Sequence, residues 1–176
     1  MSKPATRVTT PEGTLSFPHL LQPKSSDDGD PPKHSCTLIF DKGQDLSNVE
    51  AAIEAAVQRG VEKKWGGTRP AKLVLPIKDG NEKTDAEGKQ RPEFADRMYI
   101  TASCSAEEKP RVVDASTQPI TDPSEVYGGA RARLAVSAFP WTFKGKKGVS
   151  LYLKNVQITG EGTPFGVVVT VEEDFS

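Results

Sequence analysis

Apolar and polar side chains alternate in several short segments, as they do in strands that bury one face. HSCTLIFD at residues 34–41 and RMYITASCS at 97–105 both alternate in this way. The two best strand candidates are ARARLAVSAF at 130–139 and GVSLYLKNVQI at 148–158. We expect further short strands at 14–21, 71–80 and 110–114, the second of them cut by Pro76.

One segment has helical periodicity instead. Ser47 and Glu50 form an S-x-x-E capping box, with Leu46 ahead of it as a staple residue. Apolar residues then recur at helical spacing, at Val49, Ala52, Ile53, Ala56 and Val57. The glycine pair 66–67 ends the helix. One helix, five to seven strands and no internal repeat indicate an antiparallel α+β fold or an all-β barrel.

Two segments between these elements are too polar for regular structure. PKSSDDGDPP at 23–32 combines prolines with charged and small residues, which predicts a loop. NEKTDAEGKQRPEFAD at 81–96 is longer and mixes both signs of charge. We expect it to form a long, mobile loop.

The length and composition point to one globular domain with polar loops. The chain has 176 residues, of which 35% are apolar and 27% charged. No apolar run approaches the roughly 18 residues of a membrane span, and the N-terminus lacks the apolar stretch of a secretory signal. We therefore expect Cys36 and Cys104 to be free thiols in a reducing cytoplasm rather than a disulfide.

The net charge of −1 conceals an uneven distribution. Residues 126–160 contain six Lys or Arg and no Asp or Glu, whereas residues 161–176 carry a net charge of −4. Four aromatic residues, Phe139, Trp141, Phe143 and Tyr152, interleave with the six cations. Such asymmetry is typical of nucleic-acid contact combined with an acidic tail.

In the strand that begins at Ala130, the odd positions are basic at one end and aromatic at the other. We expect strand pairing to stop or bulge at Pro140. If this strand pairs with 148–158, one sheet face carries cations and aromatics together, as binding of single-stranded nucleic acid without sequence preference requires. The candidate DNA contacts are Arg131, Arg133, Phe139, Trp141, Lys144, Lys146, Lys147, Tyr152 and Lys154, with Phe143 in second rank. The alternative is that the aromatics are core residues and the lysines form a solvated hairpin tip.

The end of the helix and the end of the chain add further candidates. Lys63, Lys64 and Trp65 are second-rank DNA contacts, although lysines at this place also suit the helix dipole. The chain ends in a short acidic segment with one aromatic residue. We expect this tail either to occupy an empty basic groove or to dock onto a partner's basic pocket, and a solvated terminus is the alternative. Its candidate contacts are Glu172, Glu173, Asp174 and Phe175.

Several stretches together resemble a family of bacteriophage single-stranded DNA-binding proteins. They span the chain from about Pro31 to its C-terminus, and their order and spacing carry the resemblance. The stretches are KWGG (64–67), PIKDG (76–80), RPEFAD (91–96), ITAS (100–103), PITDPSEVYGG (119–129), KGVSLYLKNVQ (147–157) and the EEDF ending (172–175). The resemblance implies an oligonucleotide/oligosaccharide-binding (OB) barrel that coats single strands during phage replication and recombination. It also implies an acidic tail that recruits partners such as a polymerase or nuclease.

We therefore expect a mainly β fold with one main α-helix, arranged as an OB-like antiparallel β-barrel with long loops. The domain would span residues 1–166 and the acidic tail residues 167–176. Single-stranded DNA and replication or recombination proteins are the expected partners, in the cytoplasm of an infected bacterial host. Duplex DNA and self-association stay open, and no membrane partner or cofactor is expected. A plain OB barrel carries its helix between strands three and four, whereas this helix follows the second or third strand. Either a strand near the N-terminus is missing from the prediction or the barrel is elaborated.

Catalytic and metal chemistry finds less support. The two histidines and two cysteines lack the close C-x-x-C or H-x-x-x-H pairs of structural zinc sites. Neither a GxxxxGK[ST] nor a GxSxG motif is present. The acids of segment 79–93 would suit a magnesium nuclease, but they lie among cations in a polar loop. The remaining alternative to a DNA-binding protein is a phage virion or scaffold protein whose basic hairpin contacts another subunit.

Overall fold

The chain is mainly β-structure with one long helix, as expected from the sequence. A computed structural model describes residues 5–25, 31–84 and 87–162. Short 3-10 turns lie at Gly80–Glu82, Pro92–Phe94 and Pro123–Glu125. In chain order, the other elements are β1 (Arg7–Thr9), β2 (Gly13–Lys24), β3 (Lys33–Asp41), α1 (Ser47–Lys63), β4 (Lys78–Asp79), β5 (Arg97–Ser105), β6 (Arg111–Val113), β7 (Arg131–Phe143) and β8 (Lys146–Gly160).

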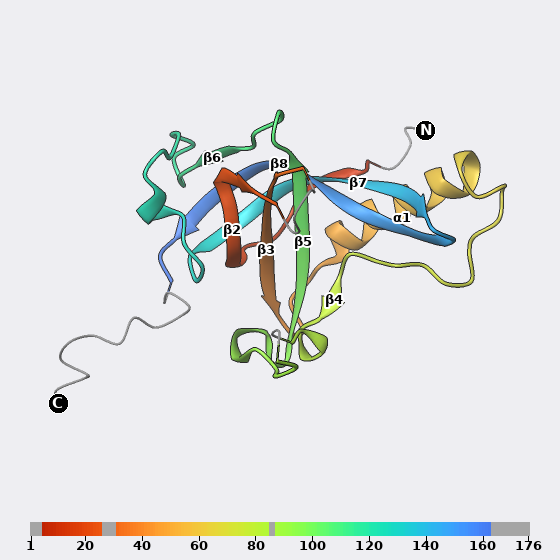
Figure 1. Cartoon of the computed structure of the whole chain (residues 1–176), viewed down its shortest axis with the longest axis horizontal. Coiled ribbons are helices and arrows are strands. Elements are labelled where there is room, and N and C mark those ends of the chain that lie inside the picture. The colour runs from red at the N-terminus through yellow and green to blue at the C-terminus, as the bar shows by residue number, and fades with distance from the viewer. Residues whose placement is uncertain (1–4, 26–30, 85–86, 163–176) are drawn as a thin grey trace.

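Five of the strands close into a barrel, in the order β2-β3-β5-β8-β7 and back to β2 (Figure 1). Neighbours are antiparallel except for β5 and β8, which run parallel where Ala102 pairs with Leu151 and Ser103 with Tyr152. A closed ring of five strands cannot alternate direction throughout, because an odd number leaves one pair pointing the same way. The expected OB-like barrel is confirmed, and its antiparallel character holds for every pair of the ring except this one.

The helix lies between the second and third strands of the barrel, because α1 follows β3 and precedes β5. The barrel is therefore elaborated relative to a plain OB fold. A strand near the N-terminus was also missed: β1 pairs with β7, with Val8 opposite Val136, outside the closed ring. Three residues are too few for alternation to reveal a strand in the sequence.

The start of α1 differs from the expected capping box. Ser47 is the first helical residue, and Leu46 occupies the cap position without a side-chain hydrogen bond. The carboxylate of Asp45 instead accepts the backbone N–H of Ser47 at 2.9 Å. The apolar stripe is confirmed, since all five of its residues are buried, and the helix packs mainly against β7. An acidic side chain one residue ahead of the cap position thus satisfies a free N–H of the first turn.

The hairpin of β7 and β8 forms as expected, and its even-numbered β7 positions from Ala132 to Ala138 are buried. The expected interruption at Pro140 is wrong, because Pro140 stands opposite Val149 and pairing continues to the end of β7. Ala138 donates its N–H to Thr6, on the side of the strand away from β8. Two residues further on, the nitrogen of Pro140 faces the same side, so its missing hydrogen removes no bond from the hairpin.

The segments between α1 and β5 differ from the sequence expectation. In 71–80, Val74 forms an isolated parallel bridge with Gly148, and only two residues form β4. The loop 81–96, expected to be mobile, folds against the barrel where it is described. Phe94 is fully buried, and its ring meets that of Tyr99 edge-on at 5.1 Å. One large aromatic side chain anchors a segment whose average composition is polar.

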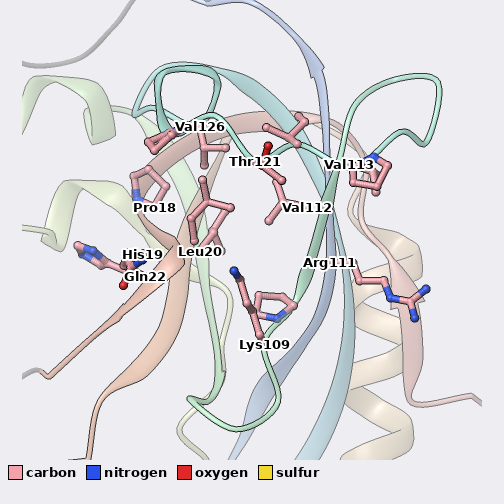
Figure 2. Close-up of a pocket in the computed structure, with 15 residues that line it drawn as sticks. Pro18, His19, Leu20, Gln22, Lys109, Arg111, Val112, Val113, Thr121 and Val126 are labelled. Atoms are coloured by element: carbon pink, nitrogen blue, oxygen red, sulfur yellow. The ribbon is translucent and has the colours of Figure 1, made fainter.

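On one side of the barrel, β2 and β6 flank a cavity of about 710 Å³ (Figure 2). Leu20 and Val112 lie in its wall, together with Ile120 and Val126 from the segment that follows β6. In Figure 1 this side lies at the opposite end of the molecule from the tip of the β7–β8 hairpin.

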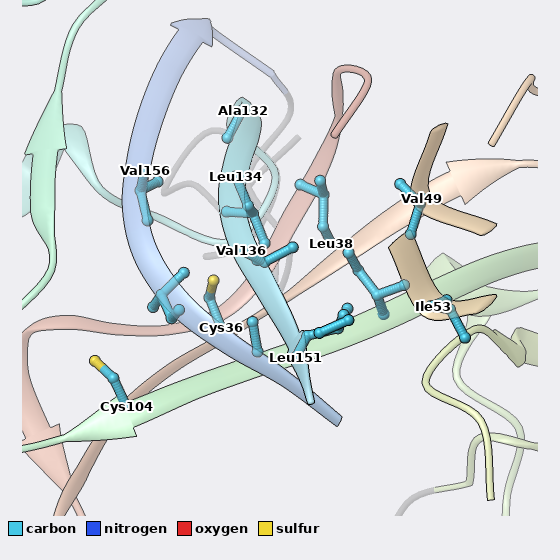
Figure 3. Packing of buried hydrophobic residues seen from close by; sticks show 14 of the residues in the cluster. Cys36, Leu38, Val49, Ile53, Cys104, Ala132, Leu134, Val136, Leu151 and Val156 are labelled. Atoms are coloured by element: carbon cyan, nitrogen blue, oxygen red, sulfur yellow. The ribbon is translucent and has the colours of Figure 1, made fainter. Parts of the chain in front are cut away.

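The core fills the barrel between its strands and α1 (Figure 3). Leu38, Leu134 and Val49 are fully buried and come from β3, β7 and the helix. Cys36 and Cys104 are free and buried, and burial raises the pKa of the Cys36 thiol to about 12. Within the described part of the chain, no helix combines the length and apolar character needed to cross a membrane.

Trp65 joins the end of α1 to the hairpin. Its indole is 5% exposed and donates from Nε1 to Thr142 Oγ1 at 3.1 Å. The ring also covers Gly60, where an added Cβ would lie 2.6 Å from the ring carbons. A glycine within the helix therefore makes room for the tryptophan.

We expect Gly60→Ala to destabilise the protein. Overpacking against a pinned ring costs about 1–3 kcal/mol, which outweighs a helix-propensity gain of roughly 1 kcal/mol. Urea denaturation measures the free energy of unfolding. Glu62→Ala, at an exposed position nearby in the helix, is the control and should change it by less than about 0.5 kcal/mol. Stabilisation by Gly60→Ala would show that Trp65 is not held over Gly60.

Candidate nucleic-acid interface

The outer face of the β7–β8 hairpin brings most of the predicted contacts together. Ser137 pairs with Tyr152, and Phe139 pairs with Ser150. Phe139 is 40% exposed, and Tyr152 is partly exposed on the same face. The sequence alternation therefore places both rings on the outside of the barrel, where they can contact a ligand.

The tip of the hairpin is a two-residue turn. Lys144 and Gly145 both have positive φ, 49° and 78°, as a type I′ turn requires. Phe143 just before the turn is 65% exposed, and the Lys144 Nζ lies 5.2 Å from its ring centroid. Lys146 and Lys147 follow directly. The tip thus offers a flat apolar ring surrounded by cations.

Tyr152 lies among charged side chains. Its hydroxyl donates a hydrogen bond to a carboxylate oxygen of Glu108, and the Lys154 Nζ lies 4.8 Å from its ring centroid. The Glu108 carboxylate stabilises the protonated phenol, and this raises the pKa of Tyr152 above its ordinary value. At neutral pH the ring is therefore neutral, with its cation partner Lys154 beside it.

The two arginines of β7 already have partners in the protein. Arg131 pairs with Glu12 (Nε to Oε1, 2.9 Å) and donates to Thr14. The hydrogen bond from Arg131 lowers the pKa of the Glu12 carboxyl. Arg133 donates to the Gln157 side chain. A phosphate at Arg131 has to compete with Glu12. Binding a phosphate there therefore costs more free energy than binding it at a cation of the face that has no acidic partner.

The candidates near the helix end separate into two groups. Lys63 and Lys64 are exposed, close to the hairpin that Trp65 contacts through Thr142. In β7, Trp141 is half-buried, and its indole ring packs on Gly148. Trp65 itself is buried in the core, so it cannot stack on a base without leaving its site. We therefore assign Trp65 a structural role at the junction of α1 and the hairpin.

A second group of cations and aromatics was missed in the sequence. The Lys83 Nζ lies 5.7, 5.9 and 5.5 Å from the ring centroids of Phe17, Phe94 and Tyr99. The Arg91 guanidinium lies 4.9 Å from the Phe17 centroid. Burial among these rings, and then the Arg91 charge, lower the pKa of Lys83. We call these five residues the Lys83 cluster.

Phe17 is the exposed member of the Lys83 cluster. It is 38% exposed and adopts a φ of 47°, at a register shift between β2 and β3. Such a conformation costs free energy in a non-glycine residue and is common at ligand-binding positions. The signal available in the sequence was one aromatic residue before Pro18. Because the loop 81–96 is distant in the sequence, no local pattern reveals that Lys83 and Arg91 lie over Phe17.

Small hydroxyl side chains lie on the outer face of the barrel, between the Lys83 cluster and the β7–β8 hairpin. Thr37 and Thr101 share a hydrogen bond of 3.0 Å on the outer face of β3 and β5, and Ser103 pairs with Tyr152 of β8. A hollow of about 290 Å³ beside Phe17 includes Thr37, Thr101 and Lys83 in its lining. The outer face of strands two and three of an OB barrel, here β3 and β5, is the usual surface for oligonucleotides, along with the loop between strands four and five. That loop is the hairpin tip here.

The predicted tail contacts, Glu172 to Phe175, lie outside the described residues. Among the described residues, no group of three or more His, Cys, Asp or Glu is arranged to hold a metal ion. The arrangement across β2, β3, β5, β8 and β7 suits noncovalent binding of a flexible polyanion with flat bases.

We expect Glu108→Gln to lower the pKa of Tyr152. A neutral amide neither stabilises the protonated phenol as a carboxylate does nor repels the phenolate. Alkaline titration of the phenolate absorbance should show one of the three tyrosines ionising at lower pH than in the parent protein. Glu107→Gln, at the adjacent exposed position, is the control. Identical titration curves would mean that Glu108 does not contact Tyr152 in solution.

Comparisons with known proteins agree with this geometry. The family model described as the ssDNA-binding protein of Enterobacter phage Enc34 matches residues 6–176. Putative protein p50 of Acyrthosiphon pisum secondary endosymbiont phage 1 is 27% identical over 165 residues, or 90% of this chain and 87% of that protein. The single-stranded DNA-binding protein of bacteriophage Enc34, solved in complex with ssDNA, gives a TM-score of 0.74 at 25% identity, covering 94% of this chain and 96% of that one. For gp2.5 of bacteriophage T7, a single-stranded DNA-binding protein, the TM-score is 0.58 at 16% identity, with coverage of 93% and 97%, and this likeness concerns the fold alone. The chain belongs to the phage ssDNA-binding protein family represented by Enterobacter phage Enc34.

Proposed function

We propose that the protein binds single-stranded DNA without sequence preference, and protects and organises single strands in phage replication and recombination. The observation that carries this proposal is one outer barrel face with exposed aromatics and cations at both ends. Phe17 with Lys83 and Arg91 forms one end, and the hairpin with Phe139 and Tyr152 forms the other. Membership of a phage ssDNA-binding protein family supports the same conclusion.

The chemistry of the face explains why binding would be independent of sequence. Aromatic rings stack on any base, because every base has a π-face, and each stack contributes about 1–3 kcal/mol. The cations address phosphates, which are the same at every position. Between the two ends, Thr101 and Ser103 carry short side chains that do not block a strand crossing β3 and β5, and Thr37 is buried beneath them. A duplex hides its bases from such rings, so the face favours single strands.

The electrostatics of the Lys83 cluster also favour a phosphate. Lys83 is partly desolvated, and the nearby Arg91 charge further disfavours its protonated form. A phosphate next to both cations would offset their repulsion and favour the protonated form of Lys83. Lys83 and Arg91 are therefore the cations on which we expect affinity to depend most at this end.

We further propose that the protein acts by binding alone and catalyses no reaction. Its acidic tail would recruit replication or recombination proteins, with Glu172, Glu173, Asp174 and Phe175 as the contacts. The place of action would be the cytoplasm of the infected bacterial host. The sequence supports these proposals through the charge of −4 in residues 161–176, which suits a basic pocket on a partner.

Removing a stacking ring should weaken DNA binding. We expect Phe17→Ala and Tyr152→Ala each to weaken binding of oligo-dT by about 1–3 kcal/mol, because one base loses its stacking surface. Fluorescence anisotropy with labelled oligo-dT measures the affinity. Tyr152→Phe keeps the ring and loses only the hydroxyl, so it should bind like the parent protein. Unchanged affinity in a folded alanine variant would remove that residue from the interface.

The cations on the outer barrel face should determine how steeply DNA affinity falls with salt concentration. We expect Lys83→Gln and Arg91→Gln each to reduce the slope of log K against log salt by about 0.7, the value for one phosphate contact on a single strand. Arg59→Gln, on the exposed side of α1, is the control and should leave the slope unchanged. Equal slopes in all three variants would move the DNA path away from the Lys83 cluster. No binding of oligo-dT at low salt would favour a virion or scaffold protein instead.

A further inference from the structure

The outer half of the β7–β8 hairpin extends away from the barrel as an arm beside α1 (Figure 1). A third segment widens this arm, because Val74 exchanges two backbone hydrogen bonds with β8, of 3.0 and 2.9 Å. Five large apolar side chains are exposed among the described residues, and three of them, Val74, Leu75 and Phe143, belong to the arm. Exposed apolar side chains that gather in one place mark an interaction site.

The end of the arm is basic and firmly held. We call residues 143–147 the hairpin tip. Phe143 is 65% exposed there, and three lysines follow it, Lys144, Lys146 and Lys147. The type I′ turn fixes the backbone of the tip, and Trp65 fastens the arm to the end of α1. A preorganised surface of this kind loses little conformational entropy when it binds a partner.

A hollow of about 470 Å³ lies between the segment that follows β6 and the end of β8. Its lining includes three acidic and three larger apolar side chains: Asp114, Glu125 and Glu161, and Ile120, Tyr127 and Ile158. None of the described residues that line it is Lys or Arg. We call it the acidic hollow. Its composition complements that of the hairpin tip in both charge and apolar character.

Two of the three acids are available to a partner. The carboxylate of Asp114 already accepts two backbone N–H groups of its own turn, from Ser116 and Gln118. Glu125 and Glu161 are exposed, and neither forms an ion pair with a described residue. These two carboxylates are therefore the ones that would meet lysines from outside the molecule.

The hairpin tip and the acidic hollow lie at opposite ends of one strand. Strand β8 begins at Lys146 in the tip and ends at Gly160, which lines the hollow. At roughly 3.3 Å per residue, the strand separates the two by up to about 45 Å. The tip of one molecule therefore cannot enter its own hollow, whereas it can enter the hollow of a second copy.

We propose that the hairpin tip of one molecule docks in the acidic hollow of the next, with Phe143 against Ile120 and Ile158 and the lysines at Glu125 and Glu161. Opposite charges favour this pairing over tip with tip or hollow with hollow. The contact is heterologous, so each added copy leaves one tip and one hollow free, and copies can add in a row. Cooperative coating of a single strand would follow, and that consequence rests on the proposed function.

The proposal divides the β7–β8 hairpin between two partners. Phe139 and Tyr152 pair with residues of the hairpin closer to the barrel, where β8 meets β5, and they stay available to DNA. Phe143 and the turn lie beyond them, at the far end of the arm. A neighbouring copy and a DNA strand can therefore bind the same hairpin together.

Sedimentation velocity on the full-length protein, without DNA, tests the contact. We expect the average mass of the parent protein to rise beyond that of a dimer between about 1 μM and about 1 mM, and to fall at high salt. Phe143→Ala with Lys146→Ala changes the tip, and Glu125→Gln with Glu161→Gln changes the hollow. Each double variant should associate at least about tenfold more weakly. Mixed in equal amounts, the two should form heterodimers and nothing larger, because each pair has one intact tip and one intact hollow.

Two control variants separate this contact from general effects. Glu62→Gln with Glu107→Gln removes the same charge at exposed positions outside the hollow and should leave self-association unchanged. Phe139→Ala should weaken oligo-dT binding and leave self-association in place. All the changed side chains of the tip and hollow variants are exposed, so their thermal unfolding midpoints should match that of the parent protein.

Four results would overturn the proposal. A parent protein that stays monomeric up to about 1 mM has no such contact. Association that stops at the dimer would indicate a closed, symmetric pair. Undiminished association of the tip variant or of the hollow variant would place the contact elsewhere. A mixture without heterodimers would exclude the pairing of tip with hollow. Oligo-dT affinity of the parent protein, measured separately, decides the proposed function, so either proposal can fail without the other.

Discussion

The parallel pairing of β5 with β8 is the constraint on which the rest of the structure depends. It closes a ring of five strands that otherwise alternate in direction, through Ala102–Leu151 and Ser103–Tyr152. Closure fixes which side of each strand is inside. In β8, Leu151 and Leu153 are buried in the core, whereas Tyr152 between them points out. The same register places Tyr152 beside Ser103 and so joins the hairpin to the outer face of β3 and β5.

The candidate interface shows how a protein of net charge −1 can present a basic aromatic face. Acidic side chains next to the face have partners within the protein. Glu12 pairs with Arg131, and Glu108 accepts a hydrogen bond from the Tyr152 hydroxyl. Lys144 and Lys83 instead lie over aromatic rings. A cation over a ring keeps a flat apolar surface and a positive charge in one place, which is what a stacked base with its phosphate requires.

The barrel also leaves one strand edge open. Because β7 leaves β2 after two residue pairs, the second half of β2 borders the cavity between β2 and β6 instead of another strand. The chain leaves the described structure next to this edge, at Gly162.

The sequence by itself determined the helix and the longer strands, and which sides of them are buried. Alternation in 130–139 and 148–158, and helical spacing in 49–57, reflect contacts between near neighbours, so they can be read locally. The outward placement of Phe139 and Tyr152 follows from the same period. Only the tertiary structure decided how distant segments meet: the parallel closure, the site of α1 after the second barrel strand, the burial of Trp65 and the Lys83 cluster. In that cluster Phe17 and Lys83 are 66 positions apart. Their contact depends on the burial of Phe94 and on the bend of β2 at Phe17, which are packing outcomes that no local pattern encodes.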